Sequence, residues 1–418
     1  SAGGPDSSQT GYAGSTLKLY LEQGAASGSL LEEILPPPLN AFFGVTSHAS
    51  ATIVTLGSTR IAATGAVSIE SASTSSAVAK TPGMLSAFDV GVTYAESNGT
   101  SVAELGSGTS VSAGGEFTLL SQVDNTMQSE VSVESGTISP MGTAAANSGG
   151  AGITGVKIPG PAISVAYGKA RSTSQTTIAA GATVTAGGVD IEANNSNDFE
   201  VSATSTSVAP GLFNPQVNGQ APLNKLGASD SNNSAANQGQ GAGIAVSDLG
   251  SSADTQIDGS VVDSGSGTVQ AESVNTTDDT LSNSVIRNSE PWETKKANLG
   301  AVRQNTGQFG LSAAITYVTM TNDAEAHIGA SAQMTVAGSL TVLANAQDPI
   351  RASAIGAGMQ ESKVAIGGAV SIAQETNTGN ASIDSNLGVN VGGSLTISGQ
   401  SAIPLAVLPI KQYQQLYQ

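Results

Sequence analysis

The sequence predicts an all-β protein, a single-stranded parallel β-helix (β-solenoid) with short non-repeat elements at both ends. The first observation is a five-residue unit, glycine-x-apolar-x-apolar, which recurs every 50 to 80 residues. It begins at Gly65, Gly115, Gly187, Gly267, Gly338 and Gly393. Apolar residues at every second position after a glycine are typical of a strand with one buried face. The recurrence indicates an internal repeat with insertions of variable length.

The second observation is the composition. The 418 residues include 51 glycines and no cysteine, and only 11% are charged, against roughly 25% in an ordinary globular domain. Without disulfides or thiolate metal sites, stability must come from backbone ladders and apolar packing. With only 4% aromatic residues, the sequence favours a stack of thin β-coils over an enzyme with a large core.

The third observation is the charge. A net charge of −18 argues against a nucleic-acid partner and against anionic membrane surfaces, since both attract clustered Lys and Arg. No stretch of eighteen apolar residues occurs, so we expect no membrane span. The start of the chain lacks the pattern of a signal peptide, and we expect a mature form or an excised segment. The composition is typical of secreted bacterial fibrous proteins and predicts an extracellular or cell-surface location.

Residues 1–44 differ from the rest of the chain, and we expect a leader followed by a cap or assembly element over 15–44. Alternating leucines over 16–21 predict a strand. Residues 29–35 predict a short helix, because Ser27 or Ser29 can cap its N terminus and Pro36 ends it. A stack of coils has an open apolar end that needs a cover.

Residues 45–400 are predicted to hold about six degenerate modules. Each carries a small-residue apolar strand such as 162–167, an Ala-x-Ile step such as 326–328, the glycine unit and a polar strand. Three or four strands in each module predict two to three coils, if a coil takes roughly 20 residues. Fifteen to twenty coils would then form a rod on the order of 70–100 Å long.

Three inserts interrupt the modules near 136–160, 208–241 and 283–306. Long loops on a regular scaffold often carry function, so the third insert, with the only tryptophan, Trp292, is a candidate ligand loop. The apolar tail at 401–418 is predicted to fold back as a cap or to offer a strand to another subunit. The candidate assembly residues are Leu17, Leu19, Leu21, Leu30, Leu31 and Leu35 near the N terminus, and Ile403, Leu405, Val407, Leu408, Ile410, Tyr413 and Tyr417 in the tail.

Catalytic patterns are scarce, and we expect no catalytic, cofactor-binding or metal site. The two histidines are His48 and His327, and alternation places His327 on an outward face, where one histidine makes no metal site. A polysaccharide-cleaving enzyme stays open as an alternative, since paired carboxylates perform that reaction. Its candidates are Asp278 and Asp279, with Asp254, Asp258 and Asp263 nearby. Calcium is the one cofactor that the aspartates, including Asp230, leave open, although the calcium-binding nonapeptide is missing.

Two modules carry a family resemblance. Residues 367–397, with Gly-Gly-Ala-Val-Ser-Ile and Gly-Ser-Leu-Thr-Ile, and residues 326–344 resemble the repeats of giant secreted bacterial filamentous adhesins, of the leukotoxin type and, more loosely, the filamentous-haemagglutinin type. The resemblance covers about 45–400. It implies a right-handed parallel β-helix on or released from the cell surface, acting in adhesion or as a fibre. This chain departs from the family in having one short array with distinct ends.

These observations predict a non-enzymatic, extracellular structural subunit whose partners are copies of itself, joined end to end through 15–44 and 401–418 into a fibre or surface layer. Two alternatives stay open. One is an adhesin segment that binds a cell-surface glycan or host protein through its inserts. The other is the polysaccharide-cleaving enzyme.

Overall fold

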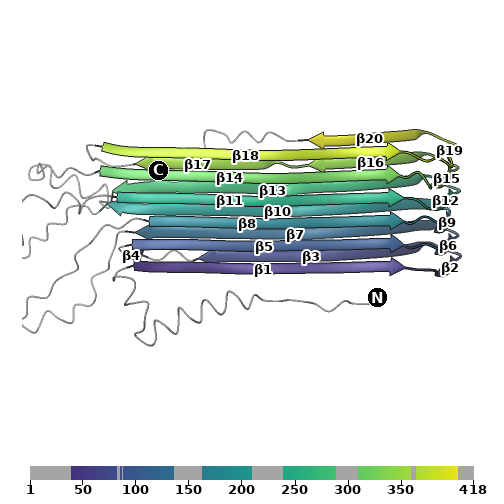
Figure 1. The fold of residues 1–418 in the computed structure, drawn as a ribbon, viewed down its shortest axis with the longest axis horizontal. Helices are drawn as coiled ribbons and strands as arrows, with labels where there is room; N and C mark the ends of the chain where they lie inside the picture. Colours follow the sequence, from purple (N-terminus) through teal and green to yellow (C-terminus); the bar gives the residue numbers. More distant parts are fainter. Residues whose placement is uncertain are drawn as a thin grey trace, which may run out of the picture.

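Every strand in the structure pairs with its neighbours in parallel. The structure, a computed structural model, describes residues 39–81, 85–86, 88–135, 162–209, 239–288, 309–358 and 364–402. Across these ranges it contains strands, turns and bends but no helix (Figure 1). The predicted all-β class and the parallel pairing are therefore confirmed.

The strands form three sheets, which we call A, B and C. The chain passes through them repeatedly in that order. Sheet A contains β1 (Leu39–Leu56), β5 (Phe88–Leu105), β8 (Ala162–Ile178), β11 (Gly239–Ile257), β14 (Phe309–Ile328) and β18 (Val364–Ile383). Sheet B contains the short strands β2 (Arg60–Ala63), β6 (Ser110–Ala113), β9 (Thr183–Ala186), β12 (Ser260–Asp263), β15 (Gln333–Val336) and β19 (Val389–Val391). Sheet C contains β3 (Val67–Thr81), β7 (Glu116–Ser135), β10 (Gly188–Ala209), β13 (Gly267–Asn288), β16 (Leu340–Gln347) and β20 (Leu395–Ala402), with β4 (Leu85–Ser86) beside β7 and β17 (Ile350–Gly358) beside β13.

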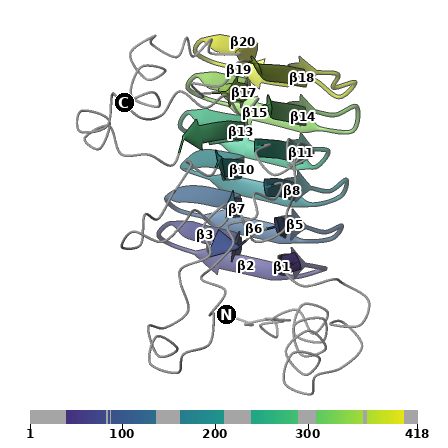
Figure 2. The same ribbon diagram turned by 90° about the vertical axis from the view of Figure 1, so that its left-hand side faces the viewer.

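One module of the sequence makes one pass through sheets A, B and C, which we call a tier. The six tiers lie one above another, from β1–β3 at one end to β18–β20 at the other (Figure 2). The estimate of two to three coils per module is therefore wrong. The strands reach 22 residues, so segments that look like separate strands in the sequence belong to one. At about 4.8 Å per tier the stack is on the order of 25–30 Å high.

The long strands alternate strictly between inward and outward residues, because side chains of a strand point to opposite faces. In β8 every second side chain is buried from Ala162 to Ile178. The inward faces of sheets A and C pack together into two apolar clusters, one beside sheet B around Phe117 and Leu340, the other around Met127 and Phe199. Small residues fill much of this thin core, as the composition predicts.

Five of the six motif glycines lie in the turn from sheet B to sheet C. The predicted unit at Gly267 is wrong by two residues: Gly267 begins β13, in register with Val189 and Leu340, and Gly265 takes the turn position of that tier. The Gly115 amide donates to the Gly65 carbonyl at 3.1 Å, and Gly393 donates to Gly338 at 2.8 Å. A Cβ atom at Gly338 would lie 2.6 Å from the Gly265 carbonyl oxygen. Close approach of backbones, rather than a positive φ, therefore explains the glycine of the motif.

The strands extend beyond the expected boundaries of the repeat. β1 begins at Leu39, so residues 39–44 lie in sheet A. The strands β10, β11 and β13 occupy 208–209, 239–241 and 283–288 of the expected inserts. The insert at 136–160 and the remainder of the other two lie outside the described residues. Within the described ranges, no helix is long and apolar enough to cross a membrane.

Candidate assembly surfaces

The last tier leaves inward apolar side chains uncovered. Leu395 and Ile397 of β20 pair in register with Leu340 and Val342 of β16, which are completely buried. Leu395 is nevertheless 49% exposed and Ile397 46% exposed. The register places both side chains on the core face of sheet C, so their exposure results from the lack of a further tier among the described residues.

The first tier is open in the same way. Leu56, Ile61 and Val67 lie in the same inward columns as Leu105, Val111 and Phe117 of the second tier. The second-tier residues are buried, whereas those of the first tier are only partly buried. The columns of Leu56, Ile61 and Val67 are therefore only partly covered at the first tier in the described part of the chain, whereas Ile69 of the same tier is buried.

The backbone is open at the same two ends. β1, β2 and β3 are terminal strands of their sheets, and so are β18, β19 and β20. Each of them has a parallel neighbour on one side only within the described ranges. A strand of this kind presents a row of unpaired N–H and C=O groups, which favours the addition of another strand.

A buried polar seam separates the two apolar clusters. Its central column contains Asn125, Asn197 and Asn275, aligned in register on β7, β10 and β13 and at most 2% exposed. The Asn197 Nδ2 atom donates to Asn275 Oδ1 at 2.7 Å, and the Ser172 hydroxyl donates to Asn197 Oδ1 at 2.5 Å. A satisfied buried polar network specifies the register of the strands that carry it.

The seam ends in an imidazole at one end of the stack and in carboxylates at the other. In the first tier, His48 Nδ1 lies 3.0 Å from the Ser75 hydroxyl. Near the last tier, Asp348 is completely buried and neither of its carboxylate oxygens has a hydrogen-bond partner within the described residues. Burial raises the pKa of Asp348 to about 6. Sequence reasoning missed Asp348 and Glu375, although Glu375 continues the inward alternation of Ser371 and Ala373 in β18.

The outer face of sheet A carries two apolar columns beside a polar border. The first column holds Phe43, Val92, Val165, Ile244, Ile315 and Val370, and the second holds Val45, Tyr94, Tyr167, Val246, Tyr317 and Ile372. Tyr94 and Tyr167 are stacked with ring centroids 5.4 Å apart. Phe43 is 45% exposed and Val370 52% exposed, so the columns form a surface that no described element covers.

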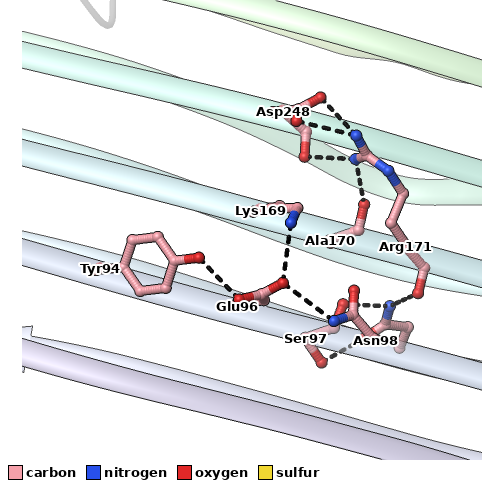
Figure 3. A network of polar contacts seen from close by, with 9 residues as sticks. Tyr94, Glu96, Ser97, Asn98, Lys169, Ala170, Arg171 and Asp248 are labelled. Carbon is pink, nitrogen blue, oxygen red and sulfur yellow. Dashed lines mark hydrogen bonds and ion pairs between the residues drawn. The ribbon is translucent and has the colours of Figure 1, made fainter. Parts of the chain in front are cut away.

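The polar border crosslinks adjacent strands of sheet A (Figure 3). Glu96 of β5 accepts a hydrogen bond from the Tyr94 hydroxyl at 2.8 Å and pairs with Lys169 of β8 at 3.1 Å. Arg171 of β8 binds both carboxylate oxygens of Asp248 of β11, at 2.8 and 2.9 Å. Burial, together with the neighbouring Glu96 carboxylate, raises the pKa of Tyr94 to about 12. These exposed pairs tie strands together and contribute little stability each.

In the part of the chain that the structure describes, the acidic residues considered for catalysis or calcium binding are spread over different sheets. Asp254 lies on β11 of sheet A and Asp279 on β13 of sheet C, where it pairs with Arg351 at 3.7 Å. Asp258 accepts a hydrogen bond from Gln256 at 2.6 Å, and Asp263 accepts one from the Gly265 amide at 2.7 Å.

The two adjacent candidates, Asp278 and Asp279, pair with successive residues of β17. No hydrogen bond or ion pair among the described residues connects two of the candidate aspartates, and no group of three potential metal ligands occurs there. Asp230 lies outside the described ranges. His327 takes the expected outward position in β14, and its Nδ1 atom lies 2.7 Å from the Ser382 hydroxyl.

The residues proposed for assembly from the sequence lie outside the described part of the chain, as does Trp292. They are Leu17, Leu19, Leu21, Leu30, Leu31, Leu35, Ile403, Leu405, Val407, Leu408, Ile410, Tyr413 and Tyr417. The structure thus directs attention to the terminal tiers themselves. Comparison with known proteins finds no matching family, no matching curated protein and no matching solved structure.

Proposed function

We propose that this protein is an extracellular structural subunit that stacks end to end with copies of itself. The observation that supports this proposal is that the columns of Leu56, Ile61 and Val67 are incompletely buried at both ends of the stack within the described ranges. The proposal includes a closed solenoid, in which the segments that follow sheet C return the chain to sheet A of the next tier. The proposed role is structural rather than catalytic; within the described ranges, Asp254, Asp263 and Asp279 lie on three different sheets.

The two open ends match one another chemically. Three inward columns begin at Leu56, Ile61 and Val67 in the first tier. In the last tier the same columns finish at Ile383, Val389 and Leu395. A second copy placed above the first, in the same orientation, would continue each column with an aliphatic side chain. Burial of such surface contributes roughly 25 cal/mol for each Å².

Stacking of this kind produces a filament. The last tier of one copy would contact the first tier of the next, so the interface is heterologous, and a heterologous contact that does not close into a ring is open-ended. Parallel pairing between β18 of one copy and β1 of the next would satisfy the open backbone groups. The repeat along the filament would be on the order of 29 Å, six tiers at about 4.8 Å each.

Sedimentation and negative-stain electron microscopy of a glycine variant test the proposal. A Cβ at Gly65 meets nothing within 4 Å, whereas a Cβ at the equivalent Gly115 lies 3.0 Å from the backbone nitrogen of Ala66 in the preceding tier. Gly65→Ala should therefore leave the single copy intact and obstruct the addition of a preceding copy. Gly368→Ala, which also meets nothing within 4 Å and lies in an outward column of β18, is the matched control.

The expected result is filaments for the unmodified chain and for Gly368→Ala, with shorter or absent filaments for Gly65→Ala. Monodisperse single copies of the unmodified chain at every protein concentration would contradict end-to-end assembly. Filaments of unchanged length in Gly65→Ala would exclude a junction made by the terminal tiers.

A second candidate function is adhesion, and the exposed apolar columns of sheet A favour it. Aromatic side chains such as Tyr94, Tyr167 and Tyr317 along a regular face can stack on sugar rings or pack on a protein partner. Binding of Tyr94→Ala/Tyr167→Ala and the unmodified chain to a glycan array tests this candidate. Equal binding by both proteins, or no binding by either, would contradict recognition of glycans by this face.

A further inference from the structure

One inward column of sheet A carries ionisable side chains only at its two ends. The column contains His48, Ser97, Ala170, Leu249, Met320 and Glu375, one residue from each tier. If a second copy stacks without any shift along the strands, β1 of that copy lies beside β18 of the first. His48 of one copy then takes the position next to Glu375 of the other.

The hydrogen bonds around His48 determine which of its ring nitrogens can donate to a further group. The Ser76 amide donates to His48 Nδ1 at 3.3 Å, and the Ser75 hydroxyl lies 3.0 Å from the same nitrogen. Because a backbone amide can only donate, Nδ1 is an acceptor in the neutral ring, and Nε2 carries the hydrogen. A carboxylate is a suitable acceptor for Nε2–H, and it also stabilises the protonated imidazole.

Glu375 is a carboxylate without a cation at the other end. It accepts a hydrogen bond from Asn377 Nδ2 at 2.6 Å. The one charged group that faces it from the described strands packed against β18 is Asp348, between β16 and β17, which has the same sign. Burial, with a contribution from Asp348, raises the pKa of Glu375 to about 7.

The other charged groups on the strands packed against β18 point elsewhere. Asp323, Glu325 and His327 of β14 take outward positions, and Arg351 of β17 pairs with Asp279. β16 and β20 carry no charged residue. On the opposite surface, the inward residues beside His48 are Ser75 of β3 and Ser97 of β5. His48 therefore offers Glu375 a hydrogen-bond donor from outside its own tiers.

We infer that copies of the chain join in register, with no shift along the strands, and that each junction pairs His48 of one copy with Glu375 of the next. This inference rests on the proposed end-to-end assembly and specifies its geometry. The same register continues the apolar columns of the core, aligning Leu56 with Ile383 and Val67 with Leu395. A shift of two residues would place Glu375 beside Thr46 or Ser50 and would break the polar seam.

Engineered disulfides test the register directly, because the chain has no cysteine of its own. Ala51 and Thr378 are exposed and lie in one outward column of sheet A, at opposite ends of the stack. In the inferred junction their Cα atoms are paired, at about 5 Å, which suits a disulfide. The control pair, Thr55→Cys with Thr378→Cys, is displaced by four residues, on the order of 13 Å along the strand.

After mild oxidation, Ala51→Cys/Thr378→Cys should give a ladder of covalent multimers on a non-reducing gel, while the control pair should remain monomeric. Assembly by sedimentation with no ladder for the matched pair, or with equal ladders for both pairs, would overturn the inferred register and leave end-to-end assembly standing. If no variant and no unmodified chain assembles, both the proposed function and this inference fail.

The pH dependence of assembly tests the pairing. Burial and the Asp348 carboxylate raise the pKa of Glu375 to about 7. A hydrogen bond from His48 favours the ionised carboxylate, so association should weaken as the pH falls below this value and Glu375 is protonated. We expect association about tenfold weaker at pH 4.5 than at pH 8, the effect of one pKa unit of coupling.

Exchange of the two residues separates a specific pair from a general effect of pH. His48→Glu and Glu375→His should each weaken association, because like groups then meet, and the double exchange should restore it. Thermal unfolding of each variant checks that the single copy is intact. A double exchange no better than the single variants, or a flat pH profile for the unmodified chain, would overturn the pairing.

Discussion

Asp348 is the buried group with the least compensation in the described part of the chain. The residue is 0% exposed, and burial raises the pKa of its carboxyl group from 3.8 to about 6, a rise that the neighbouring Asn275 side chain opposes only in part. Between these two pH values the folded chain keeps a proton that the unfolded chain has lost. The free energy of unfolding therefore falls as pH rises through this window, by about 3 kcal/mol in total.

Asp348→Asn should remove this penalty. We expect the variant to exceed the unmodified chain in free energy of unfolding at pH 8 by up to about 3 kcal/mol. The two should nearly match at about pH 3.5, where Asp348 is protonated in the folded chain and mostly protonated in the unfolded chain. Urea denaturation at the two pH values measures the difference. If the difference in free energy of unfolding between the two proteins is the same from pH 3.5 to 8, the folded chain does not bury an ionised Asp348.

The motif glycines provide a second prediction for single residues. A Cβ at Gly338 would lie 2.6 Å from the Gly265 carbonyl oxygen and 2.5 Å from the Ser266 hydroxyl. Gly338→Ala should lower the free energy of unfolding by about 1–3 kcal/mol, the usual cost of overpacking. Gly65→Ala, at the same motif position but with nothing within 4 Å, should be neutral in the single copy. Equal thermal unfolding temperatures for the two variants would contradict the close stacking of this turn.

Among the structural elements, the asparagine column of sheet C determines how the long strands align. Asn197 Nδ2 donates to Asn275 Oδ1 at 2.7 Å and to the Ser251 hydroxyl at 3.0 Å, and Asn197 Oδ1 accepts from Ser172. Asn197→Ala leaves Asn275 Oδ1 without this donor and the Ser172 hydroxyl without this acceptor. The Ser251 hydroxyl keeps its contact with Ser273. We expect a loss of about 3 kcal/mol in the free energy of unfolding. Urea denaturation measures it.

Asn194→Ala is the control for the asparagine column. Asn194 lies three residues away on the outward face of β10 and donates to Glu192 at 3.0 Å. Its removal should change stability by no more than about 0.5 kcal/mol. Similar losses for Asn194→Ala and Asn197→Ala would show that the seam contributes no more than a surface contact does.

Buried polar residues also explain which elements could be predicted from the sequence. Period-two alternation around the glycine motif correctly predicts strands such as β16, because apolar residues mark the inward face. In β14 the inward positions between Ala314 and Ile328 include Thr316 and Asn322. These polar residues interrupt the apolar signal, so one 20-residue strand looks like two in the sequence. The predicted two to three coils per module are wrong because buried polar residues resemble turns in the sequence.

For the whole molecule, the pairing of distant residues across tiers lies beyond what the sequence predicts. The intervals between modules vary from 50 to 80 residues, so no fixed period aligns His48 with Glu375. Their shared column follows only from five successive strand registers. The parallel all-β architecture could be predicted, because it depends on local alternation and composition. Which residues are exposed at the two ends depends on how many strands are stacked on each side of them, and this number cannot be read from the sequence.

The net charge of −18 gives a prediction for assembled copies. Neighbouring copies would lie on the order of 29 Å apart, close to the screening length of about 30 Å at 0.01 M salt and well beyond the 10 Å at 0.1 M. Repulsion between copies should therefore oppose stacking at low salt. We expect association to strengthen on the order of tenfold between 10 and 200 mM NaCl, measured by sedimentation velocity at pH 6.5.

The His48–Glu375 pair should contribute little to this salt response, because buried pairs are screened far less than exposed charges. A His48→Gln/Glu375→Gln variant should associate more weakly than the unmodified chain at every salt concentration but with the same slope. Association that weakens as salt is added would mean that attraction between exposed charges drives contact between copies. The apolar terminal tiers would then not be the source of the affinity, since burial of apolar surface does not weaken as salt is added.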